Sequence, residues 1–321
     1  MLFNIRPYRP VGDNACGAET GVKDVGRARR TVKGPRALVV PVLIDAHVHL
    51  NNYHEESRQP TIENLRSLFA KMDEWRVDHA VVITSYKHDV DRPSVEEILD
   101  VAEESPRITL VEGLRWRSEE NRTDLYALEG RIREGRVKGI KLYPGYEPYG
   151  ITDPSLESVF RLAAKHKVPV MIHTGDTYSK RAKLRHAHPL LVDDVAVDYP
   201  DVNFIMCHLG NPWFKDTAEV LYKNDNVYAD LSGLVLGEFT TEFERYLSQQ
   251  VKEMILHMGD PARQLMYGSD WPLVRMAPYV DFLEKLDLPD DQMEAIRWRT
   301  AARLFRVDVE RSRRPLKAGE G

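Results

Sequence analysis

The chain of 321 residues is 42% hydrophobic and 30% charged, a composition typical of a globular protein with a large buried core. Its net charge of −5 argues against a nucleic-acid partner, because phosphate binding usually requires a basic surface. Only two cysteines occur, which excludes a disulfide framework, and the absence of a long apolar segment leads us to expect a cytoplasmic protein that does not contact membranes.

The first 38 residues form a basic N-terminal extension before the first apolar run. Residues 1–36 contain eight lysines and arginines but three acidic residues, without the periodicity of a helix or strand. We expect a solvated appendage there, and an arm that binds a partner or covers the active site is the alternative. Residues 307–321 are polar and are expected to form a C-terminal tail. The folded domain should therefore span residues 39–306.

Eight short apolar runs rich in β-branched residues follow one another along this domain. Their apolar character is continuous rather than alternating, which is typical of strands that are covered on both faces, as in parallel sheets. The expected strands cover residues 39–49, 79–84, 108–115, 137–143, 168–174, 203–209, 226–231 and 264–270.

Helical patterns with recognisable start signals lie between these runs. Ser94 and Glu97 fit a capping box, and Asp153 followed by Pro154 fits an N-cap with a first-turn proline. Further helices are expected over residues 60–75, 124–134, 190–199, 218–223, 238–258 and 291–305. This alternation predicts an α/β fold of the (β/α)8 TIM barrel type. A doubly wound open sheet is the competing architecture, but the glycine-rich phosphate loop common in such sheets is not evident.

Residues that can bind a metal recur where the apolar runs end. His47 and His49 lie two positions apart, so both side chains project from the same face of a strand. His173, His208 and Asp270 end three later runs. Because the strands of a barrel all end at one face, these imidazoles and this carboxylate could share a single divalent ion.

The motifs around these residues resemble the amidohydrolase superfamily. The resemblance is to the amidohydrolase-2 branch, which includes aminocarboxymuconate-semialdehyde decarboxylase, and it extends from about residue 40 to residue 305. It rests on the segments 44–49 (IDAHVH), 172–175 (IHTG), 207–213 (CHLGNPW), 268–272 (GSDWP) and 302–305 (ARLF).

The resemblance implies that His47, His49, His173 and Asp270 bind one metal ion and that His208 stands beside it as a catalytic acid or base. Zinc is the expected ion, although Mn²⁺, Fe²⁺ and Co²⁺ accept similar ligands. Such an ion makes hydroxide available at neutral pH and polarises a substrate oxygen. Asp270 would accept the proton that the water releases, and His208 would stabilise or protonate the oxyanion. Since many members are dimers, the resemblance also implies a homodimer.

Lys141, Arg115 and Arg185 are the residues expected to bind the substrate. Lys141 lies near the end of the fourth run, where related two-metal hydrolases carry a carboxylated lysine, so a bridging carbamate, a substrate contact and a structural role stay open. Arg115 ends the third run, and Arg185 lies in a basic loop after the fifth. Barrel loops at this face bind substrate, which predicts an anionic small molecule, whereas the alternative is an ordinary solvated loop.

These observations predict a metal-dependent hydrolase that uses a metal-activated water on a C–O or C–N bond. The expected substrate is a small lactone, ester or amide that carries a carboxylate. Non-oxidative decarboxylation of an unsaturated or aromatic acid would use the same ligands and is the first alternative. A catalytically inactive barrel that serves as a binding module is the second, and Thr300, where the family often has asparagine, is the departure that keeps it open.

Overall fold

The computed structural model describes residues 41–53, 59–87, 91–102, 105–117, 123–235, 239–259 and 262–313. The predicted N-terminal extension, residues 1–38, lies outside the described residues, and so do residues 314–321 of the predicted tail. The strands of the predicted barrel domain all lie within the described part of the chain.

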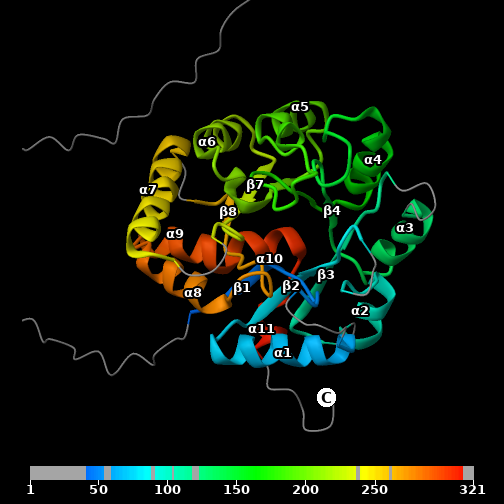
Figure 1. The fold of residues 1–321 in the computed structure, drawn as a ribbon, viewed down its shortest axis with the longest axis horizontal. Coiled ribbons are helices and arrows are strands. Elements are labelled where there is room, and N and C mark those ends of the chain that lie inside the picture. The colour runs from blue at the N-terminus through cyan, green and yellow to red at the C-terminus, as the bar shows by residue number, and fades with distance from the viewer. Residues whose placement is uncertain are drawn as a thin grey trace, which may run out of the picture. The chain divides into compact units, whose positions relative to one another are not determined.

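Eight parallel strands follow one another in chain order, with helices between them on the outside (Figure 1). The strands are β1 (Ile44–Val48), β2 (His79–Ile83), β3 (Ile108–Gly113), β4 (Ile140–Leu142), β5 (Val170–Ile172), β6 (Phe204–Met206), β7 (Val227–Asp230) and β8 (Leu265–Met266). All seven consecutive pairs are parallel. This order confirms the predicted (β/α)8 barrel and excludes the doubly wound sheet, in which the strand order reverses.

Hydrogen bonds between β1 and the segment around and after β8 complete the ring. The backbone N–H of Ala46 donates to the carbonyl of Tyr267 at 3.0 Å, and that of His49 donates to Trp271 at 2.7 Å. The N–H of Asp270 donates to the carbonyl of His47 at 2.8 Å. Pairing therefore continues beyond the short β8, and it places the histidines of β1 beside Asp270.

Helices surround the strands, and most of them cover the outer face. They are α1 (Thr61–Glu74), α2 (Val95–Ala102), α3 (Leu125–Arg133), α4 (Glu157–His166), α5 (Leu190–Asp198), α6 (Phe214–Lys223), α7 (Thr241–Met258), α8 (Met276–Lys285), α9 (Asp290–Glu294), α10 (Thr300–Phe305) and α11 (Val309–Ser312). A short π-helical segment, Ala295–Arg299, joins α9 to α10. None of the helices in the described ranges has the length and apolar character that crossing a membrane requires.

The predicted helix starts are confirmed by their hydrogen bonds. Glu97 N donates to Ser94 Oγ at 3.2 Å, and Ser94 N donates to the Glu97 carboxylate at 2.8 Å, which is the reciprocal pattern of a capping box. Asp153 Oδ1 accepts from Ser155 N at 3.0 Å.

Helices α8 and α11 were not expected from the sequence. Part of the polar segment after residue 306 is therefore ordered against the barrel.

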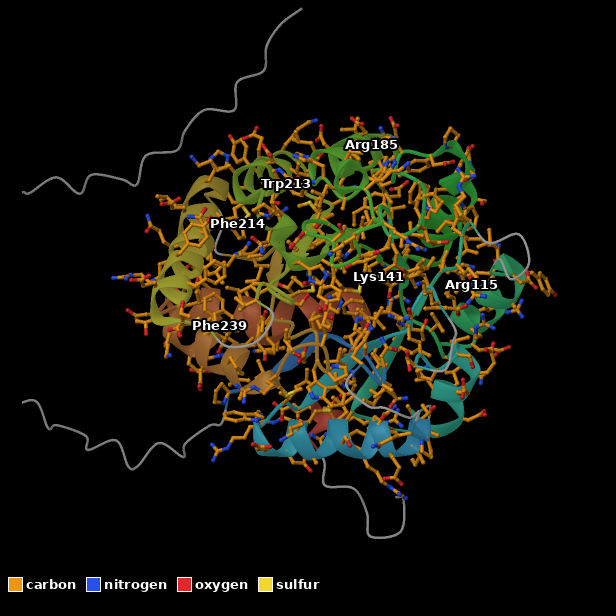
Figure 2. All side chains as sticks on the ribbon, in the orientation of Figure 1. Arg115, Lys141, Arg185, Trp213, Phe214 and Phe239 are labelled. Atoms are coloured by element: carbon orange, nitrogen blue, oxygen red, sulfur yellow. The ribbon has the colours of Figure 1, made fainter. Side chains whose placement is uncertain are left out.

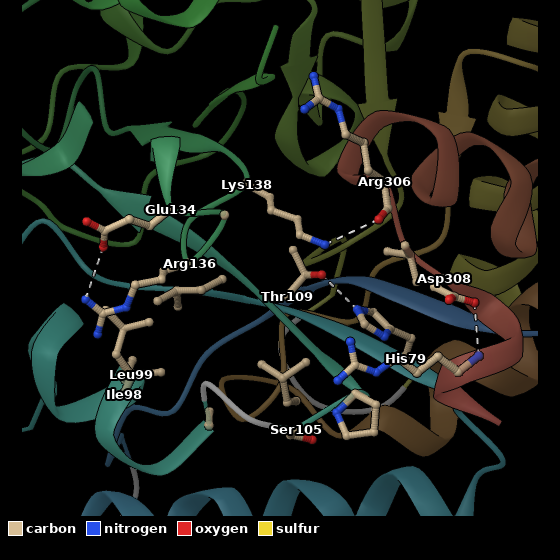
Figure 3. A pocket seen from close by; sticks show the side chains of 17 residues that line it. His79, Ile98, Leu99, Ser105, Thr109, Glu134, Arg136, Lys138, Arg306 and Asp308 are labelled. Atoms are coloured by element: carbon tan, nitrogen blue, oxygen red, sulfur yellow. Dashed lines mark hydrogen bonds and ion pairs between the residues drawn. The ribbon is translucent and has the colours of Figure 1, made fainter. Parts of the chain in front are cut away.

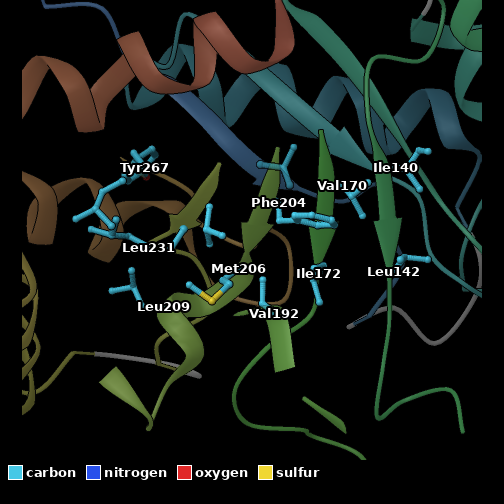
Figure 4. Packing of buried hydrophobic residues seen from close by; sticks show 14 of the residues in the cluster. Ile140, Leu142, Val170, Ile172, Val192, Phe204, Met206, Leu209, Leu231 and Tyr267 are labelled. Carbon is cyan, nitrogen blue, oxygen red and sulfur yellow. The ribbon is translucent and has the colours of Figure 1, made fainter. Parts of the chain in front are cut away.

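Both faces of the strands are buried, which explains their continuous apolar runs. Along β5, Val170 and Ile172 belong to the layer that packs against the helices, whereas Met171 belongs to the cluster inside the barrel. Figure 4 shows the outer layer, in which Val192 of α5 packs near Phe204. A strand with water on one face would need polar residues at every second position, whereas β5 and β6 are apolar throughout.

His79, the first residue of β2, attaches α11 to the amino-terminal end of the barrel. Its Nδ1 lies 2.9 Å from Ser312 Oγ, and its Nε2 lies 2.9 Å from Thr109 Oγ1. The side chain is buried, and burial lowers the pKa of His79 to about 3. A neutral imidazole suits this place because each hydroxyl can either donate or accept a hydrogen bond.

We expect the free energy of unfolding of the His79→Gln variant to depend less on pH than that of the wild type. Between pH 6 and pH 4 the unfolded chain binds a proton at His79, whose ordinary pKa is 6.5, and the folded chain does not. The wild-type free energy of unfolding should thus fall with falling pH by up to about 1.4 kcal/mol per unit from this residue alone. Urea denaturation in chelator-containing buffer at several pH values would measure the difference. Above pH 6.5 neither the folded nor the unfolded chain binds a proton at His79, so this residue should add no pH dependence to the free energy of unfolding.

Thr109→Val is the matched control, because it removes a hydrogen bond to His79 without removing the titrating group. We expect it to lower stability similarly at every pH. Identical pH dependence in wild type and His79→Gln would contradict the assignment of a neutral, buried imidazole.

Candidate metal centre

Three side chains that are distant in sequence converge at the carboxyl end of the barrel. His47 and His49 lie at the end of β1, and Asp270 lies in the loop after β8. One potential ligand atom from each lies within 4.8 Å of the other two, and all three residues are buried. Asp270 Oδ1 is 3.2 Å from His49 Nε2 and 3.7 Å from His47 Nε2. The fold therefore gathers three of the four residues that we predicted to bind a metal.

The imidazoles of His47 and His49 each have one nitrogen held by an acceptor. His47 Nδ1 lies 2.9 Å from Asp230 Oδ2, and His49 Nδ1 lies 2.7 Å from the carbonyl oxygen of Ile83. Since these oxygens accept, Nδ1 carries the proton in both rings and Nε2 keeps its lone pair. The Nε2 atoms are the ones close to Asp270. Anchoring of this kind is usual for histidines that bind metals.

His208 and His173 lie beside these three residues. The ring centre of His208 is 5.0 Å from that of His47 and 5.1 Å from that of His173. His208 Nδ1 lies 3.1 Å from the carbonyl of Ser232, and His173 Nε2 lies 3.0 Å from that of Asp176. The other nitrogen of each ring therefore keeps its lone pair. His173 is outside the group whose ligand atoms lie within 4.8 Å, so its role as the fourth ligand stays a prediction.

A buried carboxylate and a hydroxyl connect the two sides of the site. Asp230 Oδ1 accepts from the backbone N–H of His208 at 3.0 Å and from that of Ser232 at 3.1 Å. The Ser232 hydroxyl donates to the same oxygen, and its Oγ lies 2.9 Å from Nδ1 of both His47 and His208. Our sequence reasoning missed Asp230 and Ser232. An acidic residue inside the apolar run 226–231 was the available signal, because a buried carboxylate needs several donors.

Burial and neighbouring charges set the protonation states. Burial lowers the pKa of His47 to about 4, and the charge of Lys141 acts in the same direction. Burial also lowers the pKa of His173 and of His208. For Asp270, burial acts to raise the pKa, but the adjacent imidazoles outweigh it and hold the pKa at about 2. At neutral pH His47, His173 and His208 are therefore uncharged and Asp270 is ionised.

This donor set fits a divalent cation. Two imidazole lone pairs and a carboxylate that face one another repel unless a cation lies between them, and nitrogen with oxygen ligands suits Zn²⁺, Mn²⁺, Fe²⁺ or Co²⁺. His47, His208 and Asp230 form a second group with metal-ligand spacing. There, however, Asp230 bonds the protonated nitrogen of His47, so it orients that ring and leaves the cation to the first group.

The backbone adopts an unusual conformation at two residues of the site. His208 and Asp270 have φ values of 63° and 71°, in the left-handed region that residues other than glycine rarely adopt. Gly233, with φ 59°, lies between their side chains. A Cβ at Gly233 would lie 2.6 Å from His208 Nδ1 and 2.9 Å from Asp270 Oδ2. The absence of a side chain at Gly233 is therefore what lets the two groups face each other.

A small cleft of about 80 Å³ opens onto these residues. Its lining consists of Tyr146, His173, Asp176, Tyr178, His208, Asn211, Gly233, Asp270 and Leu273. The ring of Tyr146 packs edge-on against His173, with centres 4.7 Å apart. The cleft thus combines an ionised carboxylate, neutral imidazoles and an aromatic wall.

The three residues predicted to bind the substrate are not brought together (Figure 2). Lys141 is 1% exposed, and its Nζ lies 2.7 Å from Cys207 Sγ in the barrel interior. Arg115 donates through Nε to the carbonyl of Tyr86 at 3.2 Å, and Arg185 lies in the exposed loop between β5 and α5. None of the three is among the described residues that line the cleft. Their contacts with substrate stay predictions.

The chain matches a known family along most of its length. The pattern of the amidohydrolase family matches residues 44–307, a span that contains every residue of the site described above. No curated protein sequence matches the chain.

Several solved structures share the fold at low sequence identity. An uncharacterised TIM-barrel protein from Bordetella bronchiseptica is 18% identical with a TM-score of 0.65, over 85% of this chain and 99% of that one. The 2,6-dihydroxybenzoate decarboxylase from Rhizobium is 13% identical with a TM-score of 0.59, over 84% and 100%. A dihydroxybenzoic acid decarboxylase from Polaromonas, solved with manganese and the inhibitor 2-nitroresorcinol, is 13% identical with a TM-score of 0.57, over 83% and 97%. These likenesses confirm the barrel fold.

The Asp230→Asn variant should bind a divalent ion about 10- to 100-fold more weakly than the wild type, because the amide cannot enforce the Nδ1-protonated form of His47. Competition with a chromophoric chelator would measure the dissociation constant. Asp225→Asn, at an exposed position before β7, is the matched control and should bind as tightly as the wild type. Equal affinities in the two variants would contradict the orienting role.

Gly233→Ala should lower ion affinity and displace His208, because the added methyl group overlaps both His208 and Asp270. Gly259→Ala is a close control: Gly259 has φ 63°, and a Cβ there would meet nothing within 4 Å. Both variants should lose about 1 kcal/mol of stability from backbone strain. Only Gly233→Ala should lose ion binding in the same chelator assay, and a similar loss in both would point to strain alone.

Proposed function

Because the chain belongs to the amidohydrolase family, we propose that it is a metal-dependent hydrolase that adds water across a C–O or C–N bond of a small lactone, ester or amide. The observation that supports this best is the convergence of His47, His49 and ionised Asp270 beside His208, next to a cleft that Asp270 and His208 line. Such a set provides both ligands for a cation and groups that can accept or donate a proton.

His47, His49, Asp270 and, by proposal, His173 would hold the ion. When bound, a divalent ion supplies Lewis acidity that polarises a substrate oxygen and lowers the pKa of water. We propose Zn²⁺, while the manganese in the Polaromonas decarboxylase structure makes Mn²⁺ the next choice to test. Proton transfer to and from the substrate would then depend on side chains beside the ion.

His208 would act as the acid/base group. Its Nδ1 proton is directed to Ser232, which leaves a lone pair on Nε2, and the lowered pKa keeps the ring neutral at pH 7. A neutral imidazole can take a proton from water and pass it to the leaving group. Asp270, already ionised, would take up a proton only transiently, since its pKa is held at about 2.

Arg115, Lys141 and Arg185 are retained as proposed contacts of a carboxylate on the substrate. The cleft between Tyr146 and Tyr178 suits a small planar molecule, because aromatic rings pack well against flat faces. Contacts from Arg115 and Arg185 would require the loops after β3 and β5 to move toward the cleft. We further propose that the enzyme is cytoplasmic and forms a homodimer.

Non-oxidative decarboxylation is the second candidate. Two of the solved structures with the same fold are dihydroxybenzoate decarboxylases, which makes an aromatic acid a reasonable substrate to test. In that reaction His208 would first take a proton from water at Nε2 and then deliver it to the ring carbon that loses carbon dioxide. An inactive binding module is disfavoured by a site in which each imidazole keeps one lone pair free.

The full-length protein should contain one equivalent of divalent metal and lose activity when a chelator removes it. Assays with a panel of lactones, esters, amides and hydroxybenzoates should detect acid release, whereas carbon dioxide release would support the decarboxylase instead. His208→Asn should lower kcat about 10²- to 10⁴-fold while the ion remains bound.

His257→Asn, which changes an exposed histidine on α7, is the control for the His208 variant and should retain wild-type kcat. Full activity in His208→Asn would remove that residue from the mechanism. Absence of any turnover by metal-loaded protein across the panel would favour the binding module.

A further inference from the structure

A second cleft, larger than the one at the metal centre, lies at the opposite end of the barrel. Its volume is about 310 Å³, and it opens where β2, β3 and β4 begin (Figure 3). His79 lies in this cleft at the start of β2, whereas Ile83 at the end of β2 supports His49 at the metal centre. The two clefts share none of their lining residues in the described part of the chain.

Positive charge is in excess around the second cleft. Among the described residues that line it, the charged ones are Glu134, Arg136, Lys138, Arg306, Asp308 and Arg311. These are four basic and two acidic side chains. Glu134 lies 3.8 Å from Arg136, and Asp308 Oδ1 accepts from the backbone N–H of Arg311, so neither carboxylate is bound to Lys138.

Lys138 is the basic residue at the centre of this arrangement. Its side chain is half buried, and its Nζ donates to the carbonyl of Arg306 at 3.3 Å, which leaves two further N–H donors. Figure 3 shows it extending across the cleft toward Arg306. Burial lowers the pKa of Lys138, and the charges of Arg306 and Arg311 lower it further, whereas the charge of Asp308 acts to raise it. The three cations therefore repel one another.

The guanidinium of Arg306 is held by neutral acceptors rather than by a carboxylate. It donates to the carbonyls of His166 and Lys167 at 3.2 and 2.9 Å. These carbonyls lie at the carboxyl end of α4, so they fix the position of the group and offset part of its charge. A bound anion would offset the repulsion among these cations, and charge-assisted hydrogen bonds to an oxyanion are stronger than those between neutral groups.

Part of the cleft wall is apolar. Ile98 and Leu99 of α2, Ile108 and Leu110 of β3, and Val307 contribute side chains to the lining. A ligand that fits would therefore combine an anionic group with a hydrocarbon part, and the cleft volume is in the range of small-molecule sites.

We propose that this cleft binds a small organic oxyanion, a phosphate monoester or a carboxylate, whose anionic end contacts Lys138 and Arg311 and whose apolar part lies against α2 and β3. Both groups present oxygens that accept from these cations. The site is separate from the metal centre, so the proposal does not depend on the proposed hydrolase activity.

Isothermal titration calorimetry of the full-length, metal-loaded protein with phenyl phosphate and with benzoate tests the proposal. We expect saturable binding of at least one probe, and tighter binding of phenyl phosphate if the natural ligand is a phosphate monoester. Lys138→Met and Arg311→Met should each weaken that binding roughly tenfold, by removing one charge-assisted contact each. Lys138→Met keeps the aliphatic stem, and Arg311 is exposed, so the second variant remains informative if the first folds poorly.

Lys252→Met, which removes an exposed charge on α7, is the matched control and should bind the probes like the wild type. Binding that is unchanged in both Lys138→Met and Arg311→Met would place the probe elsewhere, for example at the metal centre, and would overturn the proposal. A lack of saturable binding of either probe to the wild type would overturn it as well.

Discussion

The buried carboxylate of Asp230 is the interaction on which the metal centre depends. It is 0% exposed, and it accepts hydrogen bonds from His47 on β1, from the backbone of His208 after β6 and from Ser232 after β7. A charge buried to this degree is tolerated only with several donors, and here the donors come from three strands. Burial acts to raise the pKa of Asp230, but electrostatic attraction to His47, the hydrogen bond from His47 and electrostatic attraction to His208 lower it. One side chain thereby sets the tautomer of His47 and the position of His208.

The closed barrel provides the burial and the direction that this network needs. Hydrogen bonds between β1 and the segment after β8 place His47 and His49 next to Asp270, and the left-handed backbone of His208 and Asp270 is held by the surrounding strands. Helices on the outside keep water away from the strands. Because the imidazoles of His47 and His173 are buried, they stay neutral at pH 7, which is the form that binds cations.

The two ends of the barrel carry different groups. At the carboxyl end, the segments that follow the strands bring the imidazoles of His173 and His208 and the carboxylate of Asp270 onto one cleft. At the amino end, α11 is attached through His79, and four basic side chains line a cleft whose wall is partly apolar. β2 extends between them, since His79 begins it and the carbonyl of Ile83 at its end bonds His49. In such barrels the residues at the carboxyl end usually carry out the chemistry, and those at the amino end usually stabilise the fold. The amino end of this chain carries an excess of positive charge as well.

The sequence predicted three kinds of feature, because periodicity, capping and residue spacing are local properties. These are the order of the strands, the capped starts of α2 and of the helical segment at Asp153, and the placement of the histidines and Asp270 at strand ends. The sequence alone could not reveal the roles of Asp230, Ser232 and Gly233, which depend on groups from other strands. Nor could it show that Lys141 turns to Cys207 inside the barrel while Arg115 and Arg185 lie away from the cleft. The sequence by itself thus determined which elements form and which residues end them. Only the tertiary structure decided which of those residues meet. Hydrogen bonds and charges act over a few ångströms in space, and the distance between two residues along the chain does not determine their distance in space.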